Sequence, residues 1–221
     1  MKELLSSIRQ NAVGLAIFAT VTAGAIAVAQ VLTADRIAEN IRAAESRALN
    51  ELIPASSYDN DLLNDTLSID SRFNQQLLGP LPDNAQIYRA RTNGDVSAII
   101  LPVVAPDGYT TSIDLIVGIH RDGTLAGVRV VAHRETPGLG DKIEARKSDW
   151  IQSFAGRSLN NPQPDQWGVK KDGGAFDQFT GATITPRAVV RSVKRALMFF
   201  DMHRNLLLDG ATVTKGGSDG H

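Results

Sequence analysis

The sequence predicts an α+β protein: an N-terminal transmembrane helix followed by one domain with a mostly antiparallel sheet and flanking helices. Three observations lead to this prediction. A long uncharged and apolar stretch lies near the amino terminus, four β-rich runs separated by turn signals follow, and a helical pattern comes last. The chain of 221 residues is long enough for one such domain with a proper core.

The composition excludes several classes of site. The 23 Lys and Arg residues nearly balance the 24 Asp and Glu residues, so the basic excess typical of nucleic-acid binding is missing. The absence of cysteine excludes disulfides, thiolate metal sites, cysteine-ligated iron–sulfur clusters and cysteine nucleophiles. The four histidines have no spacing typical of metal ligands. We therefore expect no nucleic-acid partner and no metal site.

The apolar stretch has the length and composition of a membrane-spanning helix. No Asp, Glu, Lys or Arg occurs between Gln10 and Ala34. At about 1.5 Å of rise per residue, such a helix spans a hydrocarbon core of roughly 30 Å. Only a helix satisfies the backbone groups of one such segment within lipid. We therefore expect residues 10–34 to be a transmembrane helix in contact with membrane lipid.

A cleaved signal peptide is the alternative interpretation of this stretch. Lys2 and Arg9 would form its n-region, and residues 27–29 (Ala-Val-Ala) resemble a cleavage site. The apolar run is longer than the roughly 7–15 residues of an h-region, which favours a retained anchor. The flanking charges are nearly equal and do not decide the orientation. The signal-like layout favours residues 1–9 as a cytoplasmic tail, with the domain on the other side.

Residues 35–84 are expected to form a stalk helix and a connector. Apolar side chains recur with helical spacing from Ile37 to Leu52, and Pro54 ends the pattern. This stalk either packs on its own domain or binds a partner. The segment 55–84 is polar and rich in turn residues, as expected of connecting structure.

Residues 85–208 are predicted to form the main domain. Asn-Gly and Asp-Gly turn signals separate its four β-rich runs, so an antiparallel meander is expected. The runs are Gln86–Arg91, Val96–Val104, Thr111–His120 and Thr124–His133. Helices are expected over Asp141–Phe154 and from Pro186 to about Leu207. The Gly-rich segment 209–221 is expected to be a flexible tail.

Two stretches have the residue types of a binding site. The first, Glu135-Thr136-Pro137-Gly138-Leu139-Gly140, leads from the fourth β-rich run into a helical segment, with Lys142 close behind. Glycines allow a loop backbone to approach a ligand closely and to take positive φ. Turns of this composition are also common without a binding role, so the pattern alone leaves both interpretations open.

The second stretch, Asp177-Gln178-Phe179-Thr180-Gly181-Ala182-Thr183, precedes the last helix. We expect Thr185 to cap this helix and Pro186 to occupy its first position. Thr180 and Thr183 then lie just outside a helix N-terminus, where unpaired N–H groups and a partial positive charge favour an anion such as phosphate. The alternative is that these threonines only cap the helix and complete a turn.

The 177–183 segment resembles the flavinylation motif of the FMN-binding domain family, D-x-x-(S/T)-G-A-(T/S). In that family a flavin transferase joins the phosphate of FMN to the last hydroxyl of the motif by a phosphoester bond. The resemblance therefore implies a covalent FMN on Thr183, and recognition of Asp177 by the transferase. Further cofactor contacts are implied for Thr180, Gly181, Ala182 and Thr185.

The 135–140 loop resembles the second signature of the same family, a loop that lines the flavin site. This resemblance implies that the loop and the residue just beyond it face the flavin ring or the ribityl chain. The implied contacts come from Glu135, Thr136, Gly138, Leu139, Gly140 and Lys142.

The stalk sequence, Asp35-Arg36-Ile37-Ala38-Glu39 and Asn50-Glu51-Leu52-Ile53-Pro54, resembles the G subunits of Rnf ion-translocating electron-transport complexes. This resemblance implies a single-pass protein of the bacterial inner membrane with its flavin domain on the periplasmic side. It also implies an electron relay within a ferredoxin:NAD oxidoreductase, assembled with other membrane and redox subunits. Because the chain has no cysteine, iron–sulfur clusters would belong to those partners.

Two alternatives remain open at this point. One is the C subunit of the sodium-translocating NADH:quinone reductase, which has the same kind of flavin domain. The other is a membrane-anchored extracytoplasmic binding or sensor module without flavin, in which the threonines merely cap a helix. A hydrolase that uses Thr183 or Glu135 is disfavoured because the sequence offers no set of nucleophile, base and orienting group.

Overall fold

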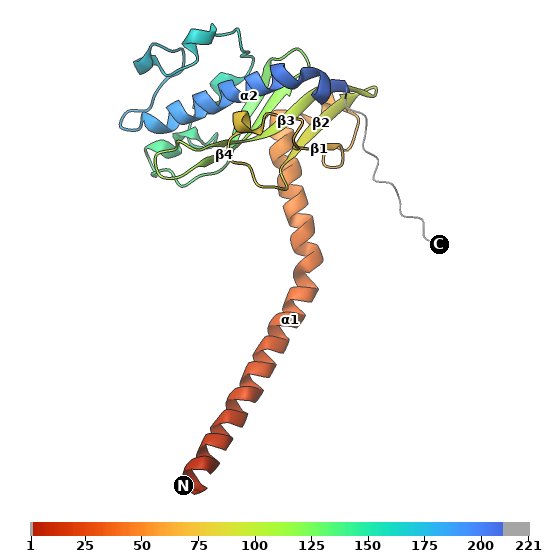
Figure 1. Cartoon of the computed structure of the whole chain (residues 1–221), viewed down its shortest axis with the longest axis vertical. Coiled ribbons are helices and arrows are strands. Elements are labelled where there is room, and N and C mark those ends of the chain that lie inside the picture. Colours follow the sequence, from red (N-terminus) through yellow and green to blue (C-terminus); the bar gives the residue numbers. More distant parts are fainter. Residues whose placement is uncertain (1, 210–221) are drawn as a thin grey trace. The chain divides into compact units, whose positions relative to one another are not determined.

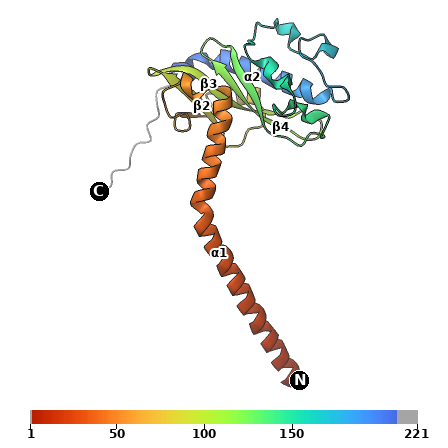
Figure 2. The same cartoon turned by 180° about the vertical axis from the view of Figure 1, so that it is seen from behind.

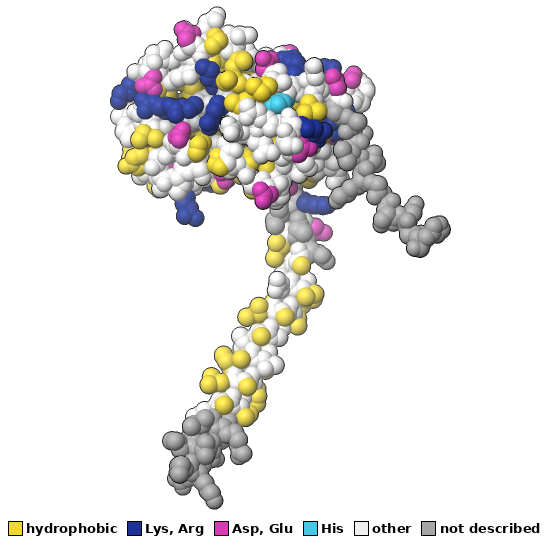
Figure 3. All heavy atoms as spheres, viewed as in Figure 1, with side chains coloured by type: hydrophobic (Ala, Val, Ile, Leu, Met, Phe, Trp, Pro, Cys, Tyr) yellow, Lys and Arg dark blue, Asp and Glu magenta, His cyan; other side chains and the backbone are white. Residues whose placement is uncertain are grey.

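A computed structural model describes residues 2–209 of the chain, which divides into two units, Met1–Arg47 and Ala48–His221. The tail predicted over 209–221 lies outside the described residues except for Asp209. Helix α1 (Lys2–Leu52) forms the first unit and contributes its last turn to the second. Its segment Asn11–Ala34 is long and apolar enough to cross a membrane, with a mean hydropathy of 2.1. Figure 3 shows hydrophobic side chains along the length of this segment on the face in view.

The second unit is built on a five-stranded antiparallel sheet in the order β1-β2-β3-β4-β5 (Figure 1). The meander predicted from the four β-rich runs is confirmed, because each strand pairs with its neighbour in sequence. The segment expected to be a connector adds a fifth strand, in which Leu67 pairs with Ile87. The strands are β1 (Thr66–Ser68), β2 (Gln86–Thr92), β3 (Asp95–Ala105), β4 (Ile113–His120) and β5 (Leu125–Ala132).

The β2–β3 turn follows directly from its sequence. Asn93 and Gly94 both have positive φ, 54° and 87°, between the paired residues Thr92 and Asp95. Two central residues with positive φ are the requirement of the hairpin turn whose twist matches that of the flanking strands. Asn-Gly is the preferred sequence for this turn because both residues tolerate that backbone conformation.

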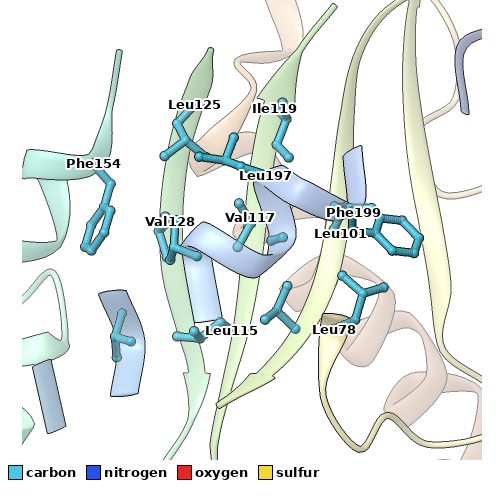
Figure 4. Packing of buried hydrophobic residues seen from close by; sticks show 14 of the residues in the cluster. Leu78, Leu101, Leu115, Val117, Ile119, Leu125, Val128, Phe154, Leu197 and Phe199 are labelled. Carbon is cyan, nitrogen blue, oxygen red and sulfur yellow. The ribbon is translucent and has the colours of Figure 1, made fainter. Parts of the chain in front are cut away.

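Helix α2 (Ile184–Asp209) lies across one face of the sheet (Figures 1 and 2). Its buried side chains pack against apolar residues of β3, β4 and β5, and Figure 4 shows Leu197 and Phe199 of α2 among Leu101, Val117 and Val128. The opposite face of the sheet is covered by residues that follow the first unit. There Leu49, Leu52, Ile53 and Leu62 pack on Ala90, Ala98 and Ile100.

The prediction of one helix over Asp141–Phe154 is wrong. The structure has two short 3-10 helices there, Gly140–Ile143 and Asp149–Phe154. Glu144 takes an extended conformation between them, and its carboxylate binds His133 and Arg146. Ser148 caps the second segment by accepting a hydrogen bond from the Trp150 N–H. These side-chain bonds hold the residues between and at the start of the two 3-10 helices. The remaining 3-10 helices are Ala55–Ser57, Gln75–Leu78, Pro164–Gln166 and Lys170–Asp172.

His203 is expected to make the stability of the domain dependent on pH. Its Nε2 accepts a hydrogen bond from the Asn74 N–H at 3.0 Å, and its ring contacts Phe73 and Phe199. Burial lowers the pKa of His203 below its ordinary value of 6.5. The unfolded chain therefore binds a proton more readily, so this contribution is present above pH 6.5 and is lost as the pH falls through the folded-state pKa.

We expect the melting temperature to be lower near pH 5.5 than near pH 7.5, and the difference to shrink in His203→Gln. Glutamine does not titrate, and its side-chain oxygen still accepts the Asn74 N–H. Thermal unfolding of both proteins, followed by circular dichroism at the two pH values, measures this. An equal difference in the two proteins would assign the pH dependence to other groups.

Candidate functional site

The 177–183 segment folds into a tight turn immediately before α2. The Ala182 N–H donates to the Phe179 carbonyl at 3.1 Å, and Gly181 has a φ of 83°. Glycine is the residue expected at the third position of a type II turn, where φ must be positive. Thr180, at the second position, is exposed, and Thr183 is half-buried. The turn therefore presents two hydroxyl groups close to the start of α2.

The start of α2 lies earlier than the sequence predicted. The helix begins at Ile184, and the Thr183 carbonyl accepts the Arg187 N–H at 3.3 Å. Thr183, not Thr185, therefore occupies the capping position. Pro186 lies third in the helix and not first, which is still within the turn where proline is tolerated. Thr183 is thus placed at the positive end of a helix of 26 residues.

Thr185 is buried and has a different partner. Its hydroxyl donates to Oε2 of Glu135, and the other carboxylate oxygen of Glu135 accepts the Thr110 N–H at 3.0 Å. The side chain of Glu135 is therefore occupied by two protein donors. This pair joins the 135–140 loop to the first turn of α2, across 50 residues of sequence.

The 135–140 loop closes on itself beside the 177–183 segment. The Thr136 carbonyl accepts the N–H groups of Leu139 and Gly140, both at 3.1 Å. A Cβ atom placed on Gly181 would lie 3.3 Å from Cδ2 of Leu139, so the two segments are in contact. The structure therefore brings together the two stretches that the sequence singled out separately.

The exposed surface around Thr183 is partly apolar. Leu139 is 41% exposed and Ile184 is 44% exposed, so both side chains present apolar surface to solvent. Thr136 and Gly138 are also exposed, and Lys142 is half-buried in the 3-10 helix that follows the loop. An apolar surface beside a helix N-terminus fits the two parts of FMN, an aromatic ring system and a phosphate.

The charges near the start of α2 are arranged in pairs. Lys and Arg side chains gather on the face of the domain that α2 covers (Figure 3). Arg187 donates to both carboxylate oxygens of Asp172, at 2.7 and 2.8 Å. These hydrogen bonds lower the pKa of Asp172. Asp177 is exposed and pairs with Lys170 at 2.6 Å, so this carboxylate lies at the surface, where a modifying enzyme could reach it.

A surface cavity of about 590 Å³ adjoins the 135–140 loop without including its residues. Each charged side chain in its wall has a partner, as in the pairs of Arg129 with Glu51 and His133 with Glu144. The cavity therefore has less to offer a phosphate than the start of α2. Its walls are formed by Glu51, Arg129, Val130, Val131, Ala132, His133, Glu144, Ala145 and Arg146.

Two further residues also shape the site: His133, at the start of the stretch that the sequence singled out, and Trp150, and sequence reasoning assigned a role to neither. His133 accepts the Glu135 N–H through Nδ1 at 3.0 Å, which holds the start of the loop. Trp150 donates from Nε1 to the Asp177 carbonyl at 2.7 Å and contacts the ring of Phe179. Trp150 carries no spacing signal because its partner lies 27 residues later, and the His133 ring accepts a backbone N–H, a group that every residue except proline supplies.

Gly181→Ala is expected to lower the free energy of unfolding by about 1–2 kcal/mol. Alanine tolerates the positive φ poorly, and its methyl group would press on Leu139. Gly138→Ala is the matched control, because Gly138 also has positive φ but has no atom within 4 Å of an added Cβ. Denaturant unfolding of both variants measures the effect, and an equal loss would show that the contact with Leu139 contributes nothing.

Comparison with known protein families gives the class of protein to which this chain belongs. Residues 108–198 match the FMN-binding domain, and residues 1–52 match the RnfG N-terminal region. The chain is 52% identical over 202 residues to the G subunit of the ion-translocating oxidoreductase complex of Pseudomonas aeruginosa (strain UCBPP-PA14), covering 91% of this chain and 92% of that protein.

Two Vibrio proteins of the same name extend this comparison. The G subunit of Vibrio vulnificus (strain YJ016) is 47% identical over 207 residues, covering 93% of this chain and 95% of that protein. The G subunit of Vibrio cholerae serotype O1 (strain M66-2) is 44% identical over 204 residues, covering 92% and 95%. The chain belongs to the family of G subunits of ion-translocating oxidoreductase complexes.

Proposed function

We propose that this chain is the membrane-anchored flavoprotein subunit that relays electrons within an ion-translocating oxidoreductase complex, between ferredoxin and NAD. The FMN-binding domain, the apolar helix and the G-subunit relatives support this proposal over a quinone-reductase subunit or a sensor without flavin. FMN supplies the electron-transfer chemistry when bound. Since the chain lacks cysteine, cysteine-ligated clusters that exchange electrons with it belong to other subunits of the complex.

The proposed attachment point is the Thr183 hydroxyl. The observation that carries this assignment is the place of Thr183 at the N-terminus of α2, half-buried and next to an exposed turn. A phosphodiester on Thr183 keeps a negative charge, which the partial positive charge of the helix N-terminus stabilises. The exposed turn gives a flavin transferase access to the hydroxyl.

The attachment is a phosphoryl transfer and involves no change of oxidation state. The Thr183 oxygen forms a bond to the flavin phosphorus, and the bond from that phosphorus to a leaving group breaks. The hydroxyl proton passes to a base of the transferase. The donor is a flavin nucleotide activated as a phosphoanhydride, whose cleavage drives the formation of the ester. Asp177, exposed in the same segment, is proposed to be recognised by the transferase.

The remaining flavin contacts are proposed to come from the exposed parts of the two segments. Thr180, Gly181 and Ala182 lie beside the phosphate position, and Thr180 offers a hydroxyl donor. The 135–140 loop contributes an exposed backbone and one apolar side chain toward the ring or the ribityl chain. The loop-side residues proposed to line the flavin are Thr136, Gly138, Leu139 and Lys142.

Mass mapping tests the attachment. Trypsin cleaves after Lys171 and Arg187 and releases a peptide that holds Thr180, Thr183 and Thr185. We expect this peptide, prepared from membranes, to be heavier by one FMN less one water, with fragment ions that place the addition on Thr183. An unmodified peptide from a strain that contains the transferase would contradict the proposal.

The arrangement in the membrane is proposed to be that of a single-pass protein. Residues 1–9 lie in the cytoplasm, residues 10–34 cross the inner membrane, and the stalk and connector (35–84) lead to a flavin domain (85–208) on the periplasmic side. The apolar segment Asn11–Ala34 and the membrane complex named for the relatives support an anchor.

The absence of cysteine makes this arrangement testable with single cysteines. Ser56 is an exposed residue of the second unit, and Ser6 precedes the apolar segment. Ser56→Cys and Ser6→Cys each place a single cysteine at one of these positions. A charged maleimide that does not cross membranes is expected to label position 56 in intact spheroplasts, and position 6 only after lysis. The reverse pattern would place the domain in the cytoplasm.

A further inference from the structure

We infer that Glu135 and Thr185 are positioning residues of the flavin site: their buried hydrogen bond holds the 135–140 loop against the first turn of α2 and so orients Thr183. This inference rests on the proposed attachment of flavin to Thr183. It assigns to Glu135 and Thr185 an indirect role in place of the direct cofactor contact that the resemblance implies.

The burial of both side chains supports this role. Glu135 is 4% exposed and Thr185 is 1% exposed, although Thr136, Leu139 and Ile184 beside them in sequence are exposed. The carboxylate accepts one hydrogen bond on each oxygen, from the Thr110 N–H and from the Thr185 hydroxyl. Groups that are buried to this extent and bonded to each other are not at the surface where a ligand would contact them.

The packing of Gly140 shows how closely the loop is held. A Cβ atom on this residue would lie 2.9 Å from Oε2 of Glu135 and 2.9 Å from Oγ1 of Thr185. The backbone of the loop therefore lies directly on the hydrogen bond between the two side chains. A side chain at position 140 would displace one of these two groups, so we include Gly140 with Glu135 and Thr185 in what we call the clamp.

The clamp acts on the attachment point through the helix. Thr185 is the second residue of α2, and Thr183 directly precedes the helix. A fixed Thr185 side chain therefore fixes the rotation of the first turn about the helix axis, and with it the direction of the Thr183 side chain. Removing the hydroxyl would leave Oε2 of Glu135 buried without a donor, which disfavours the packed arrangement by about tenfold or more.

The test compares full-length variants expressed with a flavin transferase. Thr185→Val keeps the shape of the side chain and removes the hydroxyl, whereas Thr185→Ser keeps the hydroxyl. Thr124→Val is the matched control, because Thr124 also donates to a carboxylate, that of Asp122 at 2.7 Å, but in the turn at the far end of β5. Intact mass gives the rate of flavin attachment, and fluorescence anisotropy gives the mobility of the attached flavin.

We expect Thr185→Val to slow attachment by about tenfold and to increase flavin mobility, with Thr185→Ser and Thr124→Val close to wild type. Mobility is measured well below the melting temperature, so a loss of stability alone would not change it. Wild-type rates and mobility in Thr185→Val would overturn the inference and leave the attachment to Thr183 intact. A wild-type chain without flavin would instead overturn the proposed function, and the inference with it.

Glu135→Gln keeps the test decisive if Thr185→Val does not fold. Glutamine can accept the Thr110 N–H with its oxygen and donate to the Thr185 oxygen with its amide, so the clamp persists without its charge. We expect attachment within about twofold of wild type in this variant. A loss of tenfold or more would show that the carboxylate itself acts on the flavin or the transferase, and would overturn the positioning role.

Discussion

Thr183→Ala is expected to abolish the covalent flavin while leaving the domain folded. The side chain is half-buried and its hydroxyl is the proposed ester oxygen, so alanine removes the acceptor without emptying the core. The capping contact in the structure is made by the Thr183 backbone carbonyl, which alanine keeps, so the helix start is expected to persist. We expect no flavin fluorescence in a denaturing gel, against a bright band for the wild type.

Two control variants separate attachment from other effects. Thr183→Ser keeps a hydroxyl at the same position and is expected to retain the fluorescent band. Thr180→Ala removes the exposed hydroxyl three residues earlier and is expected to retain the band as well, although more weakly. A fluorescent band that persists in Thr183→Ala and disappears in Thr180→Ala would move the attachment point to Thr180.

Electron transfer by the assembled complex is the second measurement for Thr183→Ala. Because the chain has no cysteine, no cysteine-ligated cluster can replace the flavin within this subunit. We expect ferredoxin-to-NAD electron transfer by membranes to fall to background in this variant, while the subunit is still present in the membrane. Full activity would mean that electrons bypass this subunit.

Local sequence signals predicted those parts of the fold that depend on neighbouring residues. Asn93-Gly94 specifies a tight hairpin, and the structure has positive φ at both positions. The uncharged run before Ala34 predicted the apolar helix, which the structure gives as Asn11–Ala34. The FMN-binding domain, expected from two short motifs, is borne out by the match over residues 108–198.

Distant contacts account for what the sequence did not predict. Strand β1 has only three residues, and it is defined by its pairing with β2 nearly 20 residues later. Thr185 was expected to cap α2 because it precedes a proline, but its hydroxyl donates to Glu135, 50 residues earlier. The sequence pattern suggests only partners that are close in the chain, whereas in the folded domain the Thr185 hydroxyl lies beside the buried carboxylate of Glu135.

Asp65→Ala is expected to destabilise the second unit by about 3–5 kcal/mol, a large part of the roughly 5–15 kcal/mol typical of a domain. Asp65 accepts hydrogen bonds from Nε of Arg89 at 2.7 Å and from Arg91. The side chain of Arg89 is only 1% exposed, so alanine at position 65 leaves a guanidinium buried without its carboxylate. Denaturant unfolding followed by circular dichroism measures the loss.

Burial is the reason for this effect, and a second ion pair tests that reason. Asp70 and Arg72 also pair, at 2.8 Å, but their side chains are 44% and 56% exposed. Water stabilises both charges there, so Asp70→Ala should cost far less stability than Asp65→Ala. Replacing the most buried pair on both sides, as Asp65→Leu with Arg89→Met, should recover part of the stability, because the buried charge of Arg89 is gone while Arg91, 17% exposed, still lacks its carboxylate. If the double variant is no more stable than Asp65→Ala, the cost comes from lost packing of the segment around Asp65 and not from the ion pair between Asp65 and Arg89.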